Sequence, residues 1–363
     1  MRKIVVVGAG KIGATIADIL VLGGGYHVVL VDRSVDQLAS VELSAAVDKR
    51  ELDILAPGAL DRVLVGAYAV LSAAPFHLTT HIAQTAARVG VHYLDLTEDV
   101  ASTRRVRELA AGAKSAFIPQ CGLAPGFISI VANDLAQAFD TLDSIRMRVG
   151  ALPQYPSNAL NYNLTWSTDG VINEYCEPCE AIVEGHLVDV PAMEEREEFS
   201  LDGVTYEAFN TSGGLGSLCE TYLGRVRTLN YRTIRYPGHA AIMKALLNDL
   251  GLRHRRDVLK DILENALPAT VQDVVVIFVT VSGKRHGHLV QDTYASKIYS
   301  RRIGLHRRSA IQLTTASAIC AVLDMLANGA LPASGFIRQE DITLEAFLAN
   351  RFGDAFAQVP ARV

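Results

Sequence analysis

The chain has 363 residues, of which 50% are hydrophobic and 20% are charged, and its formal net charge is −5. This length predicts two domains with substantial buried cores, and so small a charge disfavours nucleic acid or an acidic membrane as a partner. No apolar run reaches the ~18 residues of a membrane span, and Met1 leads directly into a predicted strand instead of a cleavable leader. We therefore expect a cytoplasmic protein with no nucleic-acid or membrane partner.

The first predicted strand and helix flank a glycine cluster. Residues 3–7 form a β-branched run, Gly-Ala-Gly-Lys-Ile-Gly follows at 8–13, and residues 14–22 have helical spacing. A lone G-x-G-x-x-G also fits an ordinary turn between strand and helix. Here, however, a second buried strand at 27–31 ends in Asp32, where an acidic side chain binds the ribose of a dinucleotide. The context favours a cradle for a pyrophosphate.

Each glycine has a physical role in that cradle. Gly8 permits the tight turn, Gly10 lets the backbone approach the pyrophosphate, and Gly13 lets the helix pack on the strand. The amino end of the helix offers unpaired N–H groups to the anion. Asp32 favours NAD because a carboxylate repels the extra phosphate of NADP, but Arg33 follows directly and leaves NADP open as the cofactor.

The pattern then alternates between strand and helix. Apolar strands at 68–75, 91–96 and 116–122 are separated by predicted helices at 77–90 and 99–116. Alternation of this kind predicts an α/β fold with a doubly wound parallel sheet, the Rossmann arrangement. Ligands of such sheets lie beyond the carboxyl ends of the strands.

Three segments should therefore line one cleft at that edge of the sheet, namely residues 73–75, 95–98 and 121–126. Small residues at 73–75 let the backbone approach the nicotinamide half of the cofactor. Asp95 and Glu98 suit either chemistry or helix capping, and the sequence leaves both roles open. The residues predicted to bind the dinucleotide are Gly8, Gly10, Lys11, Ile12, Gly13, Asp32, Arg33, Ala73, Ala74, Pro75, Asp95, Gly122 and Leu123.

The sequence changes in character after residue 125. A predicted helix at 127–139 leads into an alternating strand at 144–152, and turn residues are frequent over 151–215. Long strands at 270–285 and 288–300 suit a mostly antiparallel sheet.

These patterns predict two domains. Residues 1–125 and about 309–350 form the dinucleotide-binding domain, because a long apolar helix at 309–329 returns the chain to it. Residues 126–308 form a second α+β domain for catalysis and dimerisation. We expect this second domain to supply the substrate surface and a subunit contact, and the protein to be a homodimer.

The five cysteines are an odd number scattered along the chain, which disfavours a disulfide framework. Cys176 and Cys179 form one C-x-x-C, but no second pair and no histidine spacing complete a zinc site. We expect no metal.

Several segments resemble the saccharopine dehydrogenase family, and among its members the lysine 6-dehydrogenases in particular. They are GAGKIG (8–13), VHYLDLTED (91–99), CGLAPGF (121–127), TWSTDGVINEY (165–175), RTIRYPGHAAIMKAL (232–246) and GFIRQEDI (335–342). The resemblance spans nearly the whole chain. It implies an NAD(P)-dependent oxidoreductase that oxidises a carbon bearing an amine and releases a carbonyl product.

The resemblance also bears on the substrate. Glutamate-forming saccharopine dehydrogenases typically have Asp where this chain has Ala124, and they carry a longer catalytic region. The compact length is closer to L-lysine 6-dehydrogenase, which converts lysine to 2-aminoadipate 6-semialdehyde and ammonia. Three alternatives stay open: a saccharopine dehydrogenase, an enzyme like carboxynorspermidine dehydrogenase, and a dinucleotide-binding protein without turnover.

An amino-acid substrate needs a cation for its carboxylate and a group that moves protons. Arg235 is the predicted clamp because a guanidinium binds a carboxylate bidentately. His239 is the predicted proton carrier because its ordinary pKa is closest to neutral pH. Pro237 and Gly238 predict a turn that places His239 at the start of a helix, so a capping or core histidine also stays open.

Two other side chains are candidates for the same site. Trp166, the only tryptophan, either walls a pocket for an aliphatic chain or belongs to the core. Thr211 opens the glycine-rich segment 211–216, which we expect to face the substrate. The predicted catalytic set is His239, Arg235, Asp95, Trp166 and Thr211.

Overall fold

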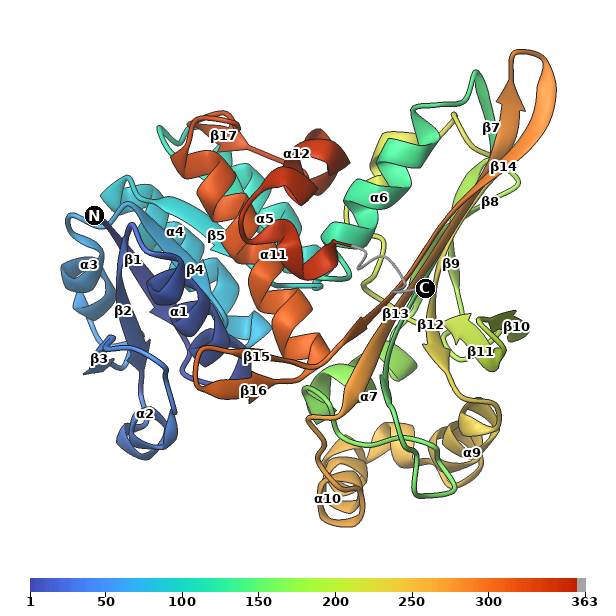
Figure 1. The fold of residues 1–363 in the computed structure, drawn as a ribbon, viewed down its shortest axis with the longest axis horizontal. Helices are drawn as coiled ribbons and strands as arrows, with labels where there is room; N and C mark the ends of the chain where they lie inside the picture. The colour runs from blue at the N-terminus through green and yellow to red at the C-terminus, as the bar shows by residue number, and fades with distance from the viewer. Residues whose placement is uncertain (358–363) are drawn as a thin grey trace. The chain divides into compact units, whose positions relative to one another are not determined.

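The structure, a computed structural model, describes residues 1–357 and contains two compact units (Figure 1). The first unit comprises Met1–Ile130, Arg301–Arg308 and, within the described residues, 312–357. The second unit comprises Val131–Ser300 and Ser309–Ile311.

The first unit contains a parallel sheet of seven strands in the order β17-β6-β5-β4-β1-β2-β3. The strands are β1 (Arg2–Val7), β2 (Tyr26–Asp32), β3 (Asp48–Glu51), β4 (Ala69–Ser72), β5 (His92–Asp95), β6 (Ala116–Ile118) and β17 (Gly335–Phe336). The order reverses at β1, whose neighbours are β2 and β4, so the sheet is doubly wound as predicted.

Helices of the first unit connect and flank these strands (Figure 1). They are α1 (Lys11–Gly23), α2 (Val35–Ser40), α3 (Ala59–Leu64), η1 (Phe76–Leu78), α4 (Thr79–Val89), α5 (Val100–Ala110), η4 (Gln339–Asp341), α12 (Leu344–Ala349) and η5 (Gly353–Phe356). Two further helices, α6 (Phe127–Ala136) and α11 (Ala310–Ala327), each contain a boundary between the units.

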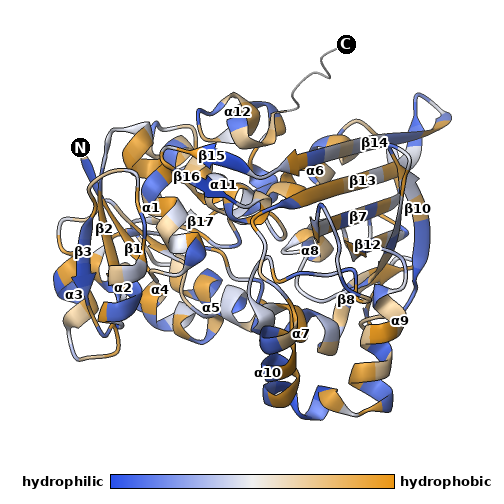
Figure 2. Ribbon diagram, turned by 60° about the horizontal axis from the view of Figure 1, so that its bottom comes forward, coloured by the Kyte–Doolittle hydropathy of each residue, from blue (hydrophilic) through white to orange (hydrophobic). Residues whose placement is uncertain are grey.

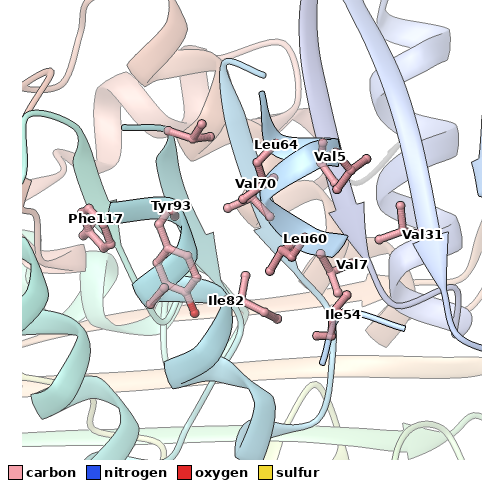
Figure 3. Packing of buried hydrophobic residues seen from close by; sticks show 14 of the residues in the cluster. Val5, Val7, Val31, Ile54, Leu60, Leu64, Val70, Ile82, Tyr93 and Phe117 are labelled. Atoms are coloured by element: carbon pink, nitrogen blue, oxygen red, sulfur yellow. The ribbon is translucent and has the colours of Figure 1, made fainter. Parts of the chain in front are cut away.

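The sheet of the first unit is held by β-branched side chains. Val5 and Val70 on neighbouring strands are fully buried and belong to one apolar cluster with Leu60 of α3 and Ile82 of α4 (Figure 3). Strands buried on both faces have continuous apolar sequences. This is why the sequence predicts these strands and their alternation with helices. Full burial of each such side chain contributes about 1.5–3 kcal/mol.

The sequence pattern missed the elements between β2 and β4. Strand β3 consists of the charged residues Asp48–Glu51, mostly exposed at the edge of the sheet. Helices α2 and α3 have six residues each, too few for a clear helical period.

The second unit contains an eight-stranded sheet with the main order β10-β11-β12-β7-β13-β14, while β8 pairs with β12 and β9. The strands are β7 (Thr141–Pro153), β8 (Cys179–Val183), β9 (His186–Val190), β10 (Glu197–Leu201), β11 (Val204–Asn210), β12 (Thr228–Arg235), β13 (Asp273–Arg285) and β14 (His288–Tyr299). Only β12 and β7 pair in parallel in this sheet. The expectation of a mostly antiparallel sheet is confirmed.

Strand β13 lies between β7 and β14 and is buried over most of its length. Its residues are mostly apolar, as the hydropathy colours of Figure 2 show. The helical elements of this unit are α7 (Thr168–Cys176), α8 (Leu218–Tyr222), α9 (His239–Lys244), the π-helical turn η2 (Ala245–Asp249), η3 (Leu252–His254) and α10 (Arg256–Ala266). Helix α7 and strands β8 to β11 were not predicted, because frequent turns break the region into short segments.

One boundary prediction needs correction. Residues 301–308, assigned from sequence to the second domain, form the hairpin of β15 (Arg301–Ile303) and β16 (His306–Arg308) and belong to the first unit. The Arg308 guanidinium lies 2.8 Å from a carboxylate oxygen of Asp18, which is fully buried in α1. A buried carboxylate needs such a partner, so this pair fixes the hairpin to the first unit.

Helix α11 is the one described helix that is long and apolar enough to cross a membrane. However, 89% of that stretch is buried inside the protein, as in a core helix. Near its end Asp324 accepts a hydrogen bond from the Tyr26 hydroxyl (2.6 Å) and pairs with Arg351 (2.6 Å).

Candidate functional site

The glycine turn between β1 and α1 shows which glycines are needed for packing. A Cβ on Gly8, whose φ is +101°, would lie 2.8 Å from the Ala73 carbonyl oxygen. A Cβ on Gly13 would lie 1.8 Å from the Gly8 carbonyl oxygen, which is impossible without a backbone shift. A Cβ on Gly10 would meet nothing within 4 Å, so this backbone is open to a ligand. The roles predicted for the three glycines fit this geometry.

Other residues predicted to bind the dinucleotide lie around this turn. Lys11 and Ile12 begin α1, where the first N–H groups have no acceptor within the helix and can bind an anion. Ala73 and Ala74 are half-buried and Pro75 is exposed in the loop after β4. The close approach between the Ala73 carbonyl and Gly8 brings this loop directly against the glycine turn.

Asp32 ends β2, as predicted, and it also fixes the glycine turn. Its Oδ2 accepts a hydrogen bond from the Ala9 N–H (2.8 Å), and its Oδ1 accepts one from the Ser34 N–H (2.9 Å). The Gln37 amide donates to the Ala9 carbonyl (3.0 Å). These bonds were not predicted, and they leave further lone pairs for ribose hydroxyls. Arg33 is exposed and makes no hydrogen bond or ion pair with a described residue.

Asp95 braces two loops at the carboxyl edge of the sheet. Its carboxylate accepts hydrogen bonds from the Tyr93 hydroxyl (2.7 Å), the Thr97 N–H (3.0 Å) and the Gln120 N–H (2.8 Å). Burial raises the pKa of Asp95 to about 6. Gln120 has a φ of +63°, a conformation uncommon outside glycine, and the bond to Asp95 stabilises it. These contacts give Asp95 a structural role.

The helix after β5 is capped by Asp99, which was not among the predicted caps. Asp99 accepts a hydrogen bond from the Ser102 N–H (2.7 Å) and is the N-cap of α5. The alternative that Asp95 or Glu98 caps this helix is therefore wrong. The segment after β6 is equally tight, because a Cβ on Gly126 would lie 2.0 Å from the Gly122 carbonyl oxygen. Leu123 is buried between these glycines.

The second unit contains a buried cation. Arg235, at the end of β12, is 2% exposed. Its Nε donates to the Tyr175 hydroxyl (2.8 Å), and its Nη1 donates to the Thr233 hydroxyl and the Ile234 carbonyl (both 2.8 Å). The guanidinium also lies 5.1 Å from the centre of the Tyr162 ring. Among residues 1–357, Nη2 has no hydrogen-bond acceptor and no carboxylate oxygen lies within ion-pair distance, but against the opposing effect of burial the charge of the buried Glu174 raises the pKa of Arg235.

His239 begins α9 after a turn in which Gly238 has a φ of +100°, as the sequence predicted. Its Nδ1 lies 2.9 Å from the Leu160 carbonyl, which can only accept, so Nδ1 carries the proton. Its Nε2 then accepts from the Tyr175 hydroxyl (3.0 Å). Burial, and next the Arg235 charge, lower the pKa of His239 to about 3. The histidine is neutral and held by two partners, which fits a positioning residue better than a proton carrier.

Tyr175 joins these two groups and was missed as a site residue. Its oxygen accepts from Arg235 and its proton goes to His239, so the three side chains form one directed chain of hydrogen bonds. Burial raises the pKa of Tyr175, and the hydroxyl therefore keeps its proton. The segment 165–175, which carries the family resemblance, contains this tyrosine and was the available signal.

The two other catalytic candidates differ from each other. The Trp166 ring packs on α7, since a Cβ on Gly170 would lie 2.3 Å from the ring. The ring also packs against an apolar cluster of buried residues, which favours a role in the core. The Thr211 hydroxyl is buried and has no hydrogen-bond partner in the described part of the chain. Strand β11 leads directly into the Thr211 loop, although no strand was predicted there.

The two cysteines of the C-x-x-C pair belong to different elements. Cys176 is half-buried at the end of α7, Cys179 is buried at the start of β8, and both are free thiols. Within residues 1–357, no three His, Cys, Asp or Glu side chains are grouped as metal ligands.

Two family models match consecutive parts of the chain. Residues 4–118 match the saccharopine dehydrogenase NADP binding domain, and residues 122–357 match the saccharopine dehydrogenase C-terminal domain. The chain belongs to the saccharopine dehydrogenase family. The family predicted from the sequence is confirmed, as is a nicotinamide dinucleotide as the cofactor of the first unit.

The individual relatives of this chain have low sequence identity to it. The NADP(+)-, L-glutamate-forming saccharopine dehydrogenase of Saccharomyces cerevisiae is 20% identical over 261 residues, 69% of this chain and 58% of that protein. The mitochondrial alpha-aminoadipic semialdehyde synthase of Rattus norvegicus is 23% identical over 272 residues, 70% of this chain and 29% of that protein. The matches thus span less than two thirds of either relative.

Solved structures share the fold. Apo saccharopine dehydrogenase (L-Glu forming) from Saccharomyces cerevisiae superposes with a TM-score of 0.79 at 16% identity, over 96% of this chain and 95% of that chain. Homospermidine synthase from Legionella pneumophila in complex with NAD gives a TM-score of 0.70 at 13% identity, over 98% and 89%. These likenesses confirm a Rossmann-type unit joined to a second α+β unit.

Proposed function

We propose that this protein is an NAD(P)-dependent oxidoreductase that oxidises the side-chain amine of an amino acid, with L-lysine 6-dehydrogenase as the best-fitting activity. The products would be 2-aminoadipate 6-semialdehyde and ammonia. Arg235 is the observation that carries this proposal. Nη2 of this buried guanidinium has no hydrogen-bond acceptor among residues 1–357, and the carboxylate of an amino acid is a ligand that would accept its hydrogen bonds.

The residues around Arg235 suit a bound carboxylate. Tyr175 and Thr233 hold Nε and Nη1, so Nη2 stays directed away from them. A fixed fork of this kind binds a carboxylate without first losing side-chain freedom. The Thr211 hydroxyl is a further buried polar group of this unit without a hydrogen-bond partner among residues 1–357.

The first unit would hold the dinucleotide. Gly10 and the first turn of α1 would bind the pyrophosphate, and Asp32 would bind the adenosine ribose. When bound, the cofactor supplies an acceptor for the hydride that leaves the amine-bearing carbon. The protein's own task is to orient that carbon, to keep the amine neutral and to direct water to the imine.

Turnover assays separate this activity from its alternatives. The purified chain is mixed with NAD⁺ or NADP⁺ and L-lysine, and the absorbance of the reduced nicotinamide is followed. Growth of that absorbance supports lysine oxidation.

Growth with saccharopine but not lysine indicates the saccharopine dehydrogenase named by the yeast relative, and growth only with a carboxylated polyamine indicates the carboxynorspermidine type. Cofactor binding without turnover on any of these amines leaves a non-catalytic dinucleotide-binding protein. Light scattering of the same sample tests the expected homodimer.

A further inference from the structure

Glu98 lies at the edge of the sheet where the reacting half of a dinucleotide binds. It follows β5. In the sheet, β4 and then β5 lie on one side of β1, and β2 lies on the other side. Since Asp32 at the end of β2 marks the adenosine side, the loops after β4, β5 and β6 face the nicotinamide side. Leu96 in the same loop lies within van der Waals distance of the Cβ position on Gly122, so the β5 and β6 loops touch.

The backbone on both sides of Glu98 is fixed. The Thr97 N–H donates to Asp95 (3.0 Å), the Asp99 N–H donates to the Thr97 hydroxyl (3.2 Å), and the Asp99 carboxylate caps α5. The Glu98 side chain, in contrast, is half-buried and makes no hydrogen bond or ion pair with a described residue. A rigid loop thus presents a carboxyl group that does not stabilise the fold.

The surroundings of Glu98 suit proton transfer. Burial, and next the negative charge of Asp99, raise the pKa of the Glu98 carboxyl to about 7. Asp99 is the charged group that acts on it. A general base is most effective when its pKa is near the working pH. Asp95, the other buried acid of this edge, already accepts three hydrogen bonds.

From this placement we propose that Glu98 is the catalytic residue that accepts the proton of the substrate ammonium group, an inference that rests on the proposed function. The carboxylate takes one proton from the nitrogen and becomes a carboxylic acid. The nitrogen lone pair then forms the C=N bond as the carbon loses a hydride, with both bonding electrons, to the dinucleotide, which is the oxidant.

A binding experiment tests the position of Glu98 without turnover. The oxidised nicotinamide ring is positively charged and the reduced ring is neutral, so an ionised carboxylate nearby favours the oxidised form. Calorimetric titration of the whole chain should show oxidised cofactor binding about three- to tenfold tighter at about pH 8 than at about pH 6, with little change for reduced cofactor. Glu98→Gln should abolish this difference. An unchanged difference in this variant overturns the proposal.

Asp99→Asn is the matched control, because Asn caps a helix as well as Asp and only the charge beside Glu98 is lost. The pH midpoint should move down in this variant while the amplitude is retained. If Glu98→Gln does not fold, the absence of that movement in Asp99→Asn counts against the proposal.

Turnover then completes the test. Glu98→Gln should lower kcat by about 10²- to 10⁴-fold, and Glu98→Asp should restore part of the loss. A wild-type chain that shows the binding effect but oxidises no amine rejects the reaction and keeps Glu98 beside the nicotinamide. A chain that oxidises amines without the binding effect rejects Glu98 and keeps the reaction.

Discussion

Buried acids are held by hydrogen bonds in both units, and the buried Arg235 of the second unit differs from them. In the first unit the buried acids Asp18, Asp95 and Asp324 each accept several hydrogen bonds from neighbouring elements. In the second unit Glu207 and Asp273 accept backbone hydrogen bonds in the same way, but the buried Arg235 keeps one nitrogen without an acceptor among residues 1–357.

This difference indicates how each unit binds its ligand. The buried acids of the first unit are saturated and hold loops in place, so its ligand-binding groups are the backbone of the glycine turn and the side chains at the sheet edge. Both units retain buried hydroxyls without a hydrogen-bond partner among residues 1–357, such as Ser72 in the first and Thr211 in the second, so the difference lies in Arg235. We therefore expect the second unit to bind its ligand through the Arg235 side chain.

The sharpest test of the backbone site is Gly13→Ala. Its Cβ would lie 1.8 Å from the Gly8 carbonyl oxygen, so the turn must shift and we expect a loss of about 3 kcal/mol in unfolding free energy together with loss of cofactor binding. Gly10→Ala is the matched control, since its Cβ meets nothing within 4 Å. It should fold normally and bind cofactor more weakly. Urea unfolding and calorimetry measure both effects, and a Gly13→Ala variant as stable as the wild type would contradict this account.

For the side-chain site, Arg235→Ala should raise KM for the amino acid about 10- to 100-fold, because charge-assisted hydrogen bonds to a carboxylate are lost. The affinity for the dinucleotide should not change. Arg227→Ala is the control, since this arginine forms exposed ion pairs with Asp143 and Glu184 in the same unit. Steady-state kinetics measures KM, and a thermal melt of each variant shows whether it is folded. An unchanged KM in Arg235→Ala rules out Arg235 as the carboxylate clamp.

Buried groups of the two units should also respond in opposite ways when the pH falls: His239 lowers the stability of the fold and Asp95 raises it. The pKa of His239 in the folded protein is below its unfolded value, so its contribution to stability is present above the unfolded pKa and is lost as the pH falls; at about pH 5.5 the loss is about 1.4 kcal/mol. The pKa of Asp95 is raised instead, so its contribution is present at low pH and is lost as the pH rises through about 6.

His239→Gln should therefore flatten the decrease in stability between about pH 7.5 and 5.5. His254→Gln, an exposed histidine in the same unit, should leave it unchanged. Equal pH dependence in wild type and His239→Gln would mean that this histidine is protonated in the folded protein. Unfolding by urea at each pH gives the comparison.

The smallest expected effect concerns the choice of cofactor. Arg33 is exposed and unpaired next to Asp32, so Arg33→Ala should weaken NADP⁺ binding about tenfold and NAD⁺ binding hardly at all. Arg105→Ala, on the outer surface of α5, should change neither. Equal weakening of both cofactors by Arg33→Ala would remove its role in selecting the phosphate.

The sequence by itself determined the central strands of the first unit. These strands are continuous apolar runs, the glycines stand at fixed spacing, and Asp32 follows at the expected distance, because all of these depend on neighbours within about thirty residues. The charged edge strand β3 has no such pattern and was missed. The same local logic placed His239 at the start of a helix. It could not assign residues 301–308 to the first unit, since that depends on the pairing of Arg308 with Asp18.

Only the tertiary structure decided how the polar side chains are used. Tyr175, Arg235 and His239 come from α7, β12 and α9, and their hydrogen bonds set the histidine tautomer, while their burial lowers its pKa. Glu98 and Asp95 are three positions apart, yet one is unbound and the other accepts three hydrogen bonds. Burial and hydrogen-bond partners arise from packing between distant segments, and no spacing along the chain encodes them.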